Sequence, residues 1–330
     1  MTSFKRFFPL LCCLLILCSL LPVSAFAAGS IDTNRDVSLT VSYRDGNTPL
    51  QGASFSIYLV ATVDEYGELT TTNQFRSFNV KIQGKNDDAW RALASTLEGY
   101  VLRDGLTPAD KGTTNNQGTI TFPTAGKKLT QGLYLVLGTR HTQNGYRFDP
   151  TPFMVMLPAQ NLTTNTWNYA LSVNAKYNAS VIPPDIPEHR NYLVNRRVIK
   201  VWDDNGFETE RPKEIVVQLL CDGKLYSTVR LKEANNWRHT WVGLDSRHTW
   251  VLVEKEVEGY TVTVTREGIT FVVTNTYGET IEDEETPLAN KPPLPKTGQL
   301  WWPVPVLICA GLLLIIFGLL RRRGAFYETE

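Results

Sequence analysis

The chain has no surplus of charge of either sign. Its 330 residues include 33 lysines and arginines and 33 aspartates and glutamates. A protein that binds nucleic acid or an acidic substrate through its net charge shows a basic excess. Composition therefore argues against such partners, and we expect no nucleic acid partner.

Patterns that mark many enzymes and metalloproteins are also missing. We find no nucleophile elbow, phosphate loop or paired-carboxylate cleft. The four histidines, which show no metal-ligand spacing, are His141, His189, His239 and His248. The run Asp203-Asp204-Asn205-Gly206 lacks the alternation of a calcium loop and is interpreted as a surface turn. We therefore expect no cofactor, no metal and no turnover of an external substrate.

Cysteine is scarce where a cross-link would be useful. The five cysteines are Cys12, Cys13, Cys18, Cys221 and Cys309. All but Cys221 fall in apolar segments at the two ends of the chain. One thiol cannot form an internal disulfide, so an exported domain either has another kind of covalent cross-link or has none. The role of Cys221 stays open.

The first 27 residues have the features of a secretory signal peptide. Lys5 and Arg6 precede an apolar run at residues 7–21, and Ala25-Phe26-Ala27 offers small residues for cleavage. An anchor helix is the alternative, but the run is short for a bilayer crossing of about 20 residues and Pro22 interrupts it. We predict cleavage after Ala27.

The C-terminal end predicts a transmembrane helix at residues 300–320. Three arginines follow it at residues 321–323, which favours a short basic cytoplasmic tail at residues 321–330. The pentapeptide Leu294-Pro295-Lys296-Thr297-Gly298 precedes the helix. The three parts in this order resemble the cell-wall sorting signal of Gram-positive surface proteins.

This resemblance implies a specific fate for the chain. A sortase cysteine would attack the carbonyl of Thr297, release the segment from Gly298 onward, and join Thr297 to an amine. That amine would belong to the peptidoglycan cross-bridge or to another subunit. The protein is thus expected outside the cell, on a Gram-positive cell wall, after a stage in which the membrane holds it.

Proline-containing segments divide the remaining chain into two domains. Residues 178–192 contain Pro183, Pro184 and Pro187, and residues 279–293 are acidic and contain proline as well. Proline fixes backbone angles and removes donors, so we interpret both as extended linkers, the second as a stalk through the wall. The domains between them are residues 28–177 and 193–278, both of ordinary size.

Short β-rich runs dominate both domains. In the second they lie at residues 198–202, 215–221, 225–231, 237–241, 249–254, 260–265 and 269–276, with a hairpin turn at Asp222-Gly223. In the first they include residues 38–43, 54–60, 119–122, 133–137 and 153–157. After Asn86, apolar residues at helical spacing predict a helix whose aromatic side chains belong to the core. We expect an all-β chain: two immunoglobulin-like or prealbumin-like β-sandwich domains in tandem, with one short helix inserted in the first and packed on it.

Three polar residues of the second domain stand on apolar strand faces. Because side chains alternate along a strand, Lys200, Glu254 and Asn275 each share a face with core residues. Each could reach solvent at a strand end. The alternative is that they meet one another, because an unpaired buried charge costs several kcal/mol.

The second domain resembles the Cna protein B-type domain throughout. The matching pieces are Val198-Ile199-Lys200-Val201-Trp202-Asp203-Asp204, Arg211-Pro212, Leu219-Leu220-Cys221-Asp222-Gly223-Lys224, Trp237, Leu244, Glu254, Gly259-Tyr260 and Thr274-Asn275-Thr276-Tyr277. The resemblance implies an intramolecular isopeptide bond, with Lys200 as donor, Asn275 as acceptor and Glu254 as the catalytic acid of a single self-directed turnover.

The first domain resembles the N-terminal domain of Gram-positive pilins. The matching pieces are Pro49-Leu50-Gln51-Gly52-Ala53-Ser54-Phe55, Gly132-Leu133-Tyr134-Leu135-Val136, Gly145-Tyr146 and Pro152-Phe153-Met154-Val155-Met156-Leu157-Pro158. Gly138 stands at the acidic position of the family, Ser42 and Tyr43 replace its lysine, and Asn174 has no evident partner. We expect no isopeptide bond in this domain.

A second pilin feature ends the first domain. Trp167, Leu171, Val173 and Lys176 keep the spacing of the pilin motif whose lysine accepts the sorted threonine of the next subunit, with Asn174-Ala175 in place of Tyr-Pro. Lys176 is therefore the candidate pilin lysine. The alternative is a solvated lysine entering a linker.

The sequence supports two functional hypotheses. The first is a structural surface protein, anchored by a sortase and polymerised as a pilus subunit. The second is a monomeric adhesin or minor pilin that binds a host or neighbouring-cell ligand. Both use Thr297, and only a shaft subunit needs Lys176.

The sorting signal is tested by Thr297→Ala. Without the threonine carbonyl that forms the acyl-enzyme, the protein should remain in the membrane fraction and be absent from the covalent wall fraction. Cell fractionation and immunoblotting measure this distribution. Unchanged wall attachment would contradict the assignment.

Overall fold

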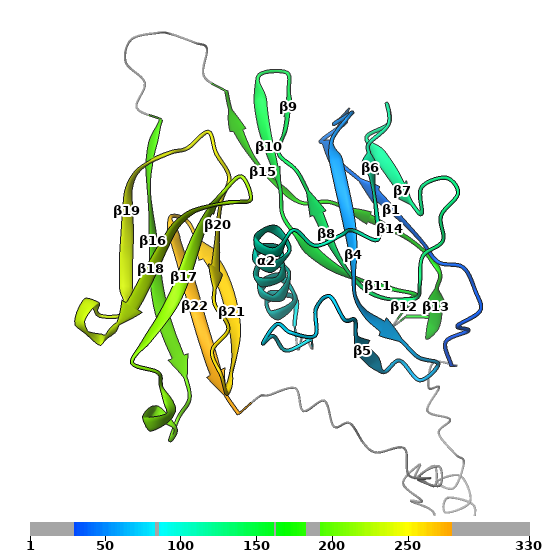
Figure 1. Ribbon diagram of the computed structural model, residues 1–330. Helices are drawn as coiled ribbons and strands as arrows, with labels where there is room; N and C mark the ends of the chain where they lie inside the picture. The colour runs from blue at the N-terminus through cyan, green and yellow to red at the C-terminus, as the bar shows by residue number, and fades with distance from the viewer. Residues whose placement is uncertain (1–29, 83–85, 162, 183–191, 279–330) are drawn as a thin grey trace, which may run out of the picture. The chain divides into compact units, whose positions relative to one another are not determined.

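The computed structural model describes residues 30–82, 86–161, 163–182 and 192–278. These residues belong to one compact unit. They form an all-β chain that carries one α-helix, α2 (Asp87–Asp104), as Figure 1 shows. The all-β expectation is confirmed for this part of the chain.

The first domain contains strands β1 to β15. Their bounds are β1 (Ser38–Ser42), β2 (Arg44–Asp45), β3 (Thr48–Pro49), β4 (Ser54–Val63), β5 (Leu69–Thr71), β6 (Asp110–Thr113), β7 (Thr119–Phe122), β8 (Gly132–Gly138), β9 (His141–Gln143), β10 (Tyr146–Pro150), β11 (Phe153–Leu157), β12 (Ala159–Asn161), β13 (Thr166–Asn168), β14 (Ala170–Asn174) and β15 (Tyr177–Val181). The principal sheets have the orders β14-β1-β7, β15-β10-β9 and β11-β8-β4-β5.

Strand β8 explains how the first domain supports both a sandwich core and a helix. Its apolar run is buried on both faces. Tyr134 and Val136 point into the cluster between the sheets, whereas Leu133 and Leu135 belong to the cluster that includes α2. Such a run, apolar at every position, is typical of a strand covered on both sides.

The second domain is a sandwich of two sheets. Its strands are β16 (Leu193–Asp203), β17 (Glu214–Cys221), β18 (Lys224–Lys232), β19 (Arg238–Asp245), β20 (Trp250–Glu254), β21 (Tyr260–Glu267) and β22 (Thr270–Tyr277), with short 3-10 helices at Glu208–Glu210 and Glu233–Asn235. One sheet has the order β19-β16-β22-β21 and the other β18-β17-β20. The seven predicted strands are confirmed. The hairpin turn between β17 and β18 is confirmed too, with φ of +48° at Asp222 and +78° at Gly223.

Helix α2 begins and ends where its sequence specifies. The side chain of Asn86 accepts a hydrogen bond from Ala89 N, and the C-cap Gly105 has a left-handed backbone, with φ of 62°. An N-cap asparagine commonly begins a helix and a left-handed C-cap glycine commonly ends one, because they satisfy backbone groups that the helix leaves unpaired. Tyr100 and Leu97 are buried, as expected for core residues.

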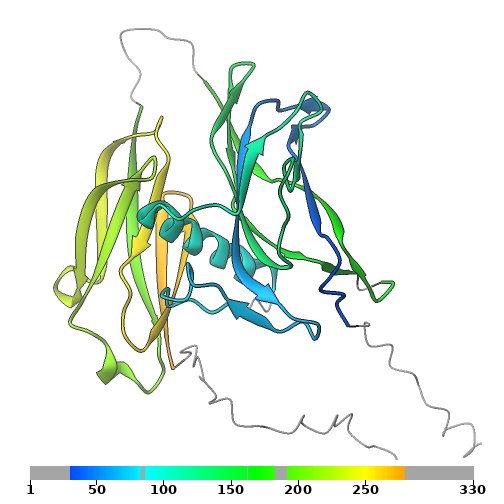
Figure 2. The same cartoon turned by 45° about the vertical axis from the view of Figure 1, so that its right-hand side comes forward.

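The helix also contacts strands β20 and β21 of the second domain, which goes beyond the expected packing on the first (Figure 1, Figure 2). Strand β21 is an edge strand, and its Val264 N donates to Thr96 Oγ1 of the helix at 2.8 Å. Gly99 lets β20 approach, since a Cβ there would lie 2.8 Å from Val253 Cγ2. The helix therefore covers sheet edges that would otherwise expose unpaired backbone groups.

Strand β15 pairs with β10 as far as Val181, so the first residues of the expected linker 178–192 are in a sheet. Other predicted segments lie outside the described residues: the signal peptide (1–27), linker residues 183–191, the stalk (279–293), the sorting pentapeptide (294–298), the apolar segment (300–320) and the basic tail (321–330). In the residues that are described, no helix is both long and apolar enough to cross a membrane.

Candidate functional site

Three polar side chains are buried together in the second domain. Lys200 is 6% exposed, Glu254 1% and Asn275 0%. Strands β16 and β22 pair in parallel, with Trp202 opposite Asn275, and β20 lies in the facing sheet. The alternation that fills the core with apolar residues thus also brings these three inside.

The contacts among them leave two oxygens without donors. Asn275 Nδ2 donates to Glu254 Oε1 at 3.3 Å. Lys200 Nζ donates to the carbonyl oxygen of Val201 at 2.6 Å and lies 3.9 Å from the ring centroid of Trp202. Within the described chain, Glu254 Oε2 and Asn275 Oδ1 are buried and accept no hydrogen bond. Each such orphan costs about 1–3 kcal/mol.

Burial decides the ionisation of the pair. Desolvation lowers the pKa of the Lys200 ammonium, and the carboxylates of Glu254 and Asp204 oppose it only in part. Desolvation raises the pKa of the Glu254 carboxyl, against the charge of Lys200. Both directions favour the uncharged forms. The arrangement therefore suits a neutral amine beside a protonated acid.

A second buried carboxylate supports this site. Asp204 is 4% exposed and accepts hydrogen bonds from Arg211 Nε at 2.8 Å and Arg211 Nη2 at 2.6 Å. Tyr260 Oη donates to it at 3.1 Å. These donors hold the pKa of Asp204 below its usual range. Because Asp204 is buried, the interpretation of residues 203–206 as a surface turn is wrong for this residue. The two hydrogen bonds from Arg211 compensate the burial of its carboxylate.

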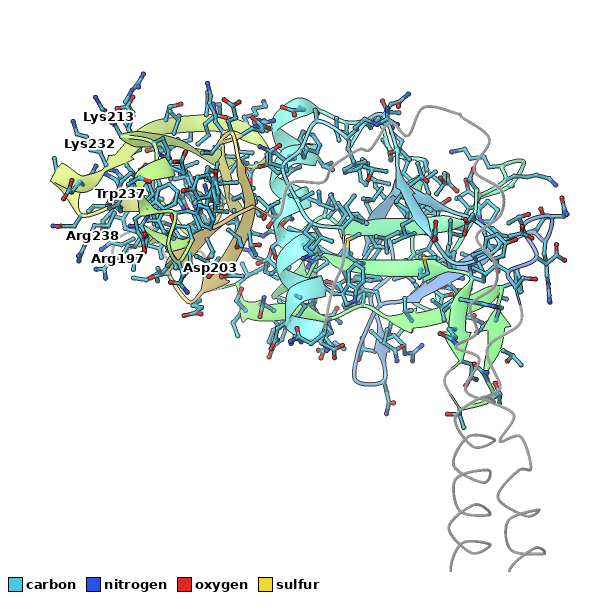
Figure 3. The ribbon with its side chains drawn as sticks, turned by 90° about the horizontal axis from the view of Figure 1, so that it is seen from below. Arg197, Asp203, Lys213, Lys232, Trp237 and Arg238 are labelled. Atoms are coloured by element: carbon cyan, nitrogen blue, oxygen red, sulfur yellow. The ribbon has the colours of Figure 1, made fainter. Side chains whose placement is uncertain are left out.

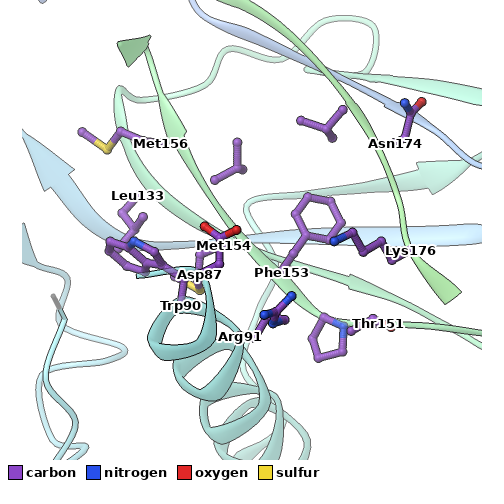
Figure 4. A pocket seen from close by; sticks show the side chains of 13 residues that line it. Asp87, Trp90, Arg91, Leu133, Thr151, Phe153, Met154, Met156, Asn174 and Lys176 are labelled. Atoms are coloured by element: carbon purple, nitrogen blue, oxygen red, sulfur yellow. The ribbon is translucent and has the colours of Figure 1, made fainter. Parts of the chain in front are cut away.

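Lys176 lies in the first domain, two residues after β14. Its side chain is exposed, and its carbonyl oxygen accepts a hydrogen bond from Thr151 N at 2.8 Å. It lines a pocket of about 390 Å³ whose other residues come largely from α2 and β11, including Trp90, Phe153 and Met154 (Figure 4). The candidate pilin lysine thus lies beside a concave, mainly apolar surface.

The other residues of the pilin pattern are placed as follows. Trp167, Leu171 and Val173 pack against the core of the first domain, and Asn174 is exposed. At Gly138 a Cβ would lie 2.7 Å from the ring of Pro150. A carboxylate-bearing side chain does not fit there without movement of β10. Ser42 is the last residue of β1, and Tyr43, which follows the strand, is fully buried.

Two protein families match the chain. Residues 31–176 match the Gram-positive pilin subunit D1, N-terminal domain. Residues 196–276 match the Cna protein B-type domain. The first β domain is thus similar to the pilin D1 domain and the second to the Cna B-type domain, and the two domains are called by these names below. Both resemblances found in the sequence are confirmed, and the two matches coincide with the two β domains.

Individual relatives cover the chain unevenly. The chain is 42% identical to the collagen adhesin of Staphylococcus aureus over 89 residues. This match covers 24% of this chain and 8% of that protein. A B repeat unit of the collagen-binding surface protein of the same species shares 19% identity over 74% of this chain and 98% of its own, with a TM-score of 0.25. The major pilin SpaD of Corynebacterium diphtheriae shares 16% identity over 74% and 65%, with a TM-score of 0.29. The chain thus spans a small part of the adhesin's length.

The pilin D1 domain holds one polar site that the sequence does not reveal. Asp110 is 1% exposed and accepts hydrogen bonds from Lys127 Nζ at 2.6 Å and from Thr124 N at 2.6 Å. It ties the loop after β7 to the start of β6. A lone aspartate at a strand end is usually solvated, so nothing in the sequence pattern marks this one.

Asp204 is tested by Asp204→Asn, which removes the charge that pairs with Arg211. At neutral pH we expect the free energy of unfolding to fall by about 3 kcal/mol, the lower end for a broken buried pair, because Arg211 is one-third exposed. The folded-state pKa of Asp204 is depressed, so this stabilisation is complete above about pH 4 and is lost as pH falls through that pKa. Denaturant titrations at several pH values measure it.

The matched control is Glu214→Gln, which removes a surface ion pair with Arg230. Those side chains are 39% and 66% exposed, so a change below about 1 kcal/mol is expected. Equal effects of the two substitutions at neutral pH would contradict the importance of Asp204.

Proposed function

We propose that this chain is a structural protein of the Gram-positive cell surface whose Cna B-type domain is closed by a covalent bond between Lys200 and Asn275. The pilin D1 and Cna B-type domains support a pilin or surface-adhesin role. The joint burial of Lys200, Glu254 and Asn275 carries the covalent part of the proposal. The covalent bond would supply the internal cross-link that a single thiol, Cys221, cannot form.

The reaction uses the uncharged forms that burial favours. The lone pair of Lys200 Nζ attacks Cγ of Asn275 while the Glu254 carboxyl protonates the amide oxygen. Glu254 then carries a proton from Nζ to Nδ2, the atom that already donates to it. The Cγ–Nδ2 bond breaks, the Nζ–Cγ bond remains, and ammonia leaves. As the carbonyl re-forms, the amide oxygen returns its proton to Glu254, which regenerates the carboxyl. The reaction runs once because it consumes the Lys200 amine and the Asn275 carboxamide.

The new bond would change the stability and the mechanics of the domain. It joins the first strand, β16, to the last, β22, and closes a loop of about 75 residues. A disulfide of that span contributes roughly 4–5 kcal/mol. Unlike a disulfide, an amide is not reduced. Pulling force between the two ends of the domain would pass through it without unfolding the intervening strands.

The bond is tested by the intact mass of the purified protein. Because the reaction expels ammonia, the wild-type chain should weigh one ammonia less than its sequence requires, whereas Lys200→Ala and Glu254→Ala should have the full mass and a lower unfolding temperature. A wild-type chain of full mass would contradict the bond.

The control for this experiment is Lys213→Ala. Lys213 and Lys232 are exposed and lie on the outside of the Cna B-type domain (Figure 3), so neither meets a buried carboxamide. The mass deficit should persist in this variant. Loss of the mass deficit in Lys213→Ala would show that the bond is formed by Lys213 and not by Lys200.

Attachment and assembly complete the proposal. A sortase would join Thr297 to the peptidoglycan cross-bridge or to Lys176 of another copy. Lys176 is exposed beside a pocket, as an acceptor amine for an enzyme-bound chain should be. The match to a collagen adhesin favours a second candidate, a monomeric wall-anchored adhesin or minor pilin that binds a host or neighbouring-cell ligand.

Lys176→Arg distinguishes these candidates. Arginine keeps the charge but is a far poorer nucleophile. For a shaft subunit, wall extracts boiled in detergent should show a ladder of covalent multimers in wild type, and the variant should collapse it to monomer without loss of wall attachment. Lys128→Arg, at an exposed lysine of the same domain, should keep the ladder. A wild-type strain with an active pilin-class sortase that yields only monomer would favour the adhesin.

A further inference from the structure

Two turns of the Cna B-type domain bring three potential metal ligands together. Cys221 is the last residue of β17, Asp222 lies in the turn to β18, and His248 lies just before β20. Hydrogen bonds tie the turns to each other: Asp222 N donates to Thr249 O at 2.9 Å, and Thr249 N donates to Asp222 Oδ1 at 2.8 Å. The backbone thus fixes the relative position of the three side chains.

The donor atoms are close enough to share one ion. One donor atom of each residue lies within 4.8 Å of the other two, and His248 Nδ1 is 2.5 Å from Asp222 Oδ2. Around a tetrahedral zinc ion the ligand atoms stand roughly 3.3–3.8 Å apart. The side chains of His248 and Asp222 are about half exposed. Small rotations of these two side chains would therefore complete the geometry.

The thiol of Cys221 lies near two carboxylates, those of Asp222 and Asp245. Asp245 itself accepts hydrogen bonds from Arg247 Nη2 at 2.6 Å and from Arg247 N at 2.8 Å. It is thus engaged elsewhere, which leaves three protein ligands.

We propose that Cys221, Asp222 and His248 bind one zinc ion, with water in the fourth position. Thiolate, imidazole and carboxylate are the ligands that zinc takes in proteins, and the thiolate disfavours magnesium and calcium. Binding forms a zinc–sulfur bond, and the thiol proton leaves to solvent. The ion would clamp the β17–β18 turn to the segment before β20.

The spacing of the histidines does not predict this site, because its ligands are distant in the sequence. His248 follows Asp222 by 26 residues, and the ligands become neighbours only through the pairing of β17 with β20, in which Cys221 lies opposite Trp250. The site is separate from the proposed isopeptide bond. Neither proposal depends on the other.

Metal titration of the full-length protein tests the site. In a background with Cys12, Cys13, Cys18 and Cys309 replaced by serine, calorimetry should show one equivalent of zinc bound. Cobalt in its place should give a thiolate-to-cobalt charge-transfer band. Cys221→Ser and His248→Gln should each weaken zinc binding at least tenfold, and Cys221→Ser should abolish the band.

The control is His141→Gln, in the pilin D1 domain, which should leave both signals unchanged. Far-ultraviolet circular dichroism without metal verifies that each variant is folded. If Cys221→Ser fails to fold, the exposed His248→Gln still decides the matter. Absence of saturable zinc binding, or equal affinity in wild type and His248→Gln, would overturn the proposal.

Discussion

A lysine and a glutamate inside one β-sandwich impose the main constraint on this molecule. Removing either charge from water costs several kcal/mol, and mutual attraction repays that only with good geometry and further hydrogen bonds. Here Glu254 Oε2 and Asn275 Oδ1 lack donors, so the pair is poorly compensated as separate side chains. The proposed amide between Lys200 and Asn275 would remove the ammonium and leave Glu254 as a neutral acid. The same burial that makes the ion pair costly makes the amine a nucleophile.

The rest of the Cna B-type domain maintains that environment. Trp202 covers Nζ of Lys200, and Tyr260 and Trp237 pack edge-on against Trp202. Asp204 also lies in this environment, and its negative charge is compensated by the guanidinium of Arg211. Helix α2 of the pilin D1 domain contacts two edge strands: β20, which carries Glu254, and β21, which pairs with β22. The side chains of Lys200, Glu254 and Asn275 are buried in this environment.

Much of this could be predicted from the sequence, because it rests on local periodicity. Alternation along short runs located all seven strands of the second domain, and it placed Lys200, Glu254 and Asn275 on apolar strand faces. Asn86 and the apolar spacing after it located the helix. What escaped prediction depends on pairing between distant residues: the burial of Asp204 against Arg211, that of Asp110 against Lys127, and the meeting of His248 with Asp222. A polar residue next to a turn looks solvated until its partner is known. The sorting segment around Thr297 rests on the sequence alone.

Proteolysis followed by tandem mass spectrometry tests the central claim most directly. If Lys200 and Asn275 are joined, trypsin cannot cut after Lys200, and the digest should contain one branched peptide that carries both residues through an amide between Nζ and Cγ. Fragment ions from both arms would locate the junction. Two separate linear peptides, one ending at Lys200 and the other carrying an intact Asn275 carboxamide, would contradict the account.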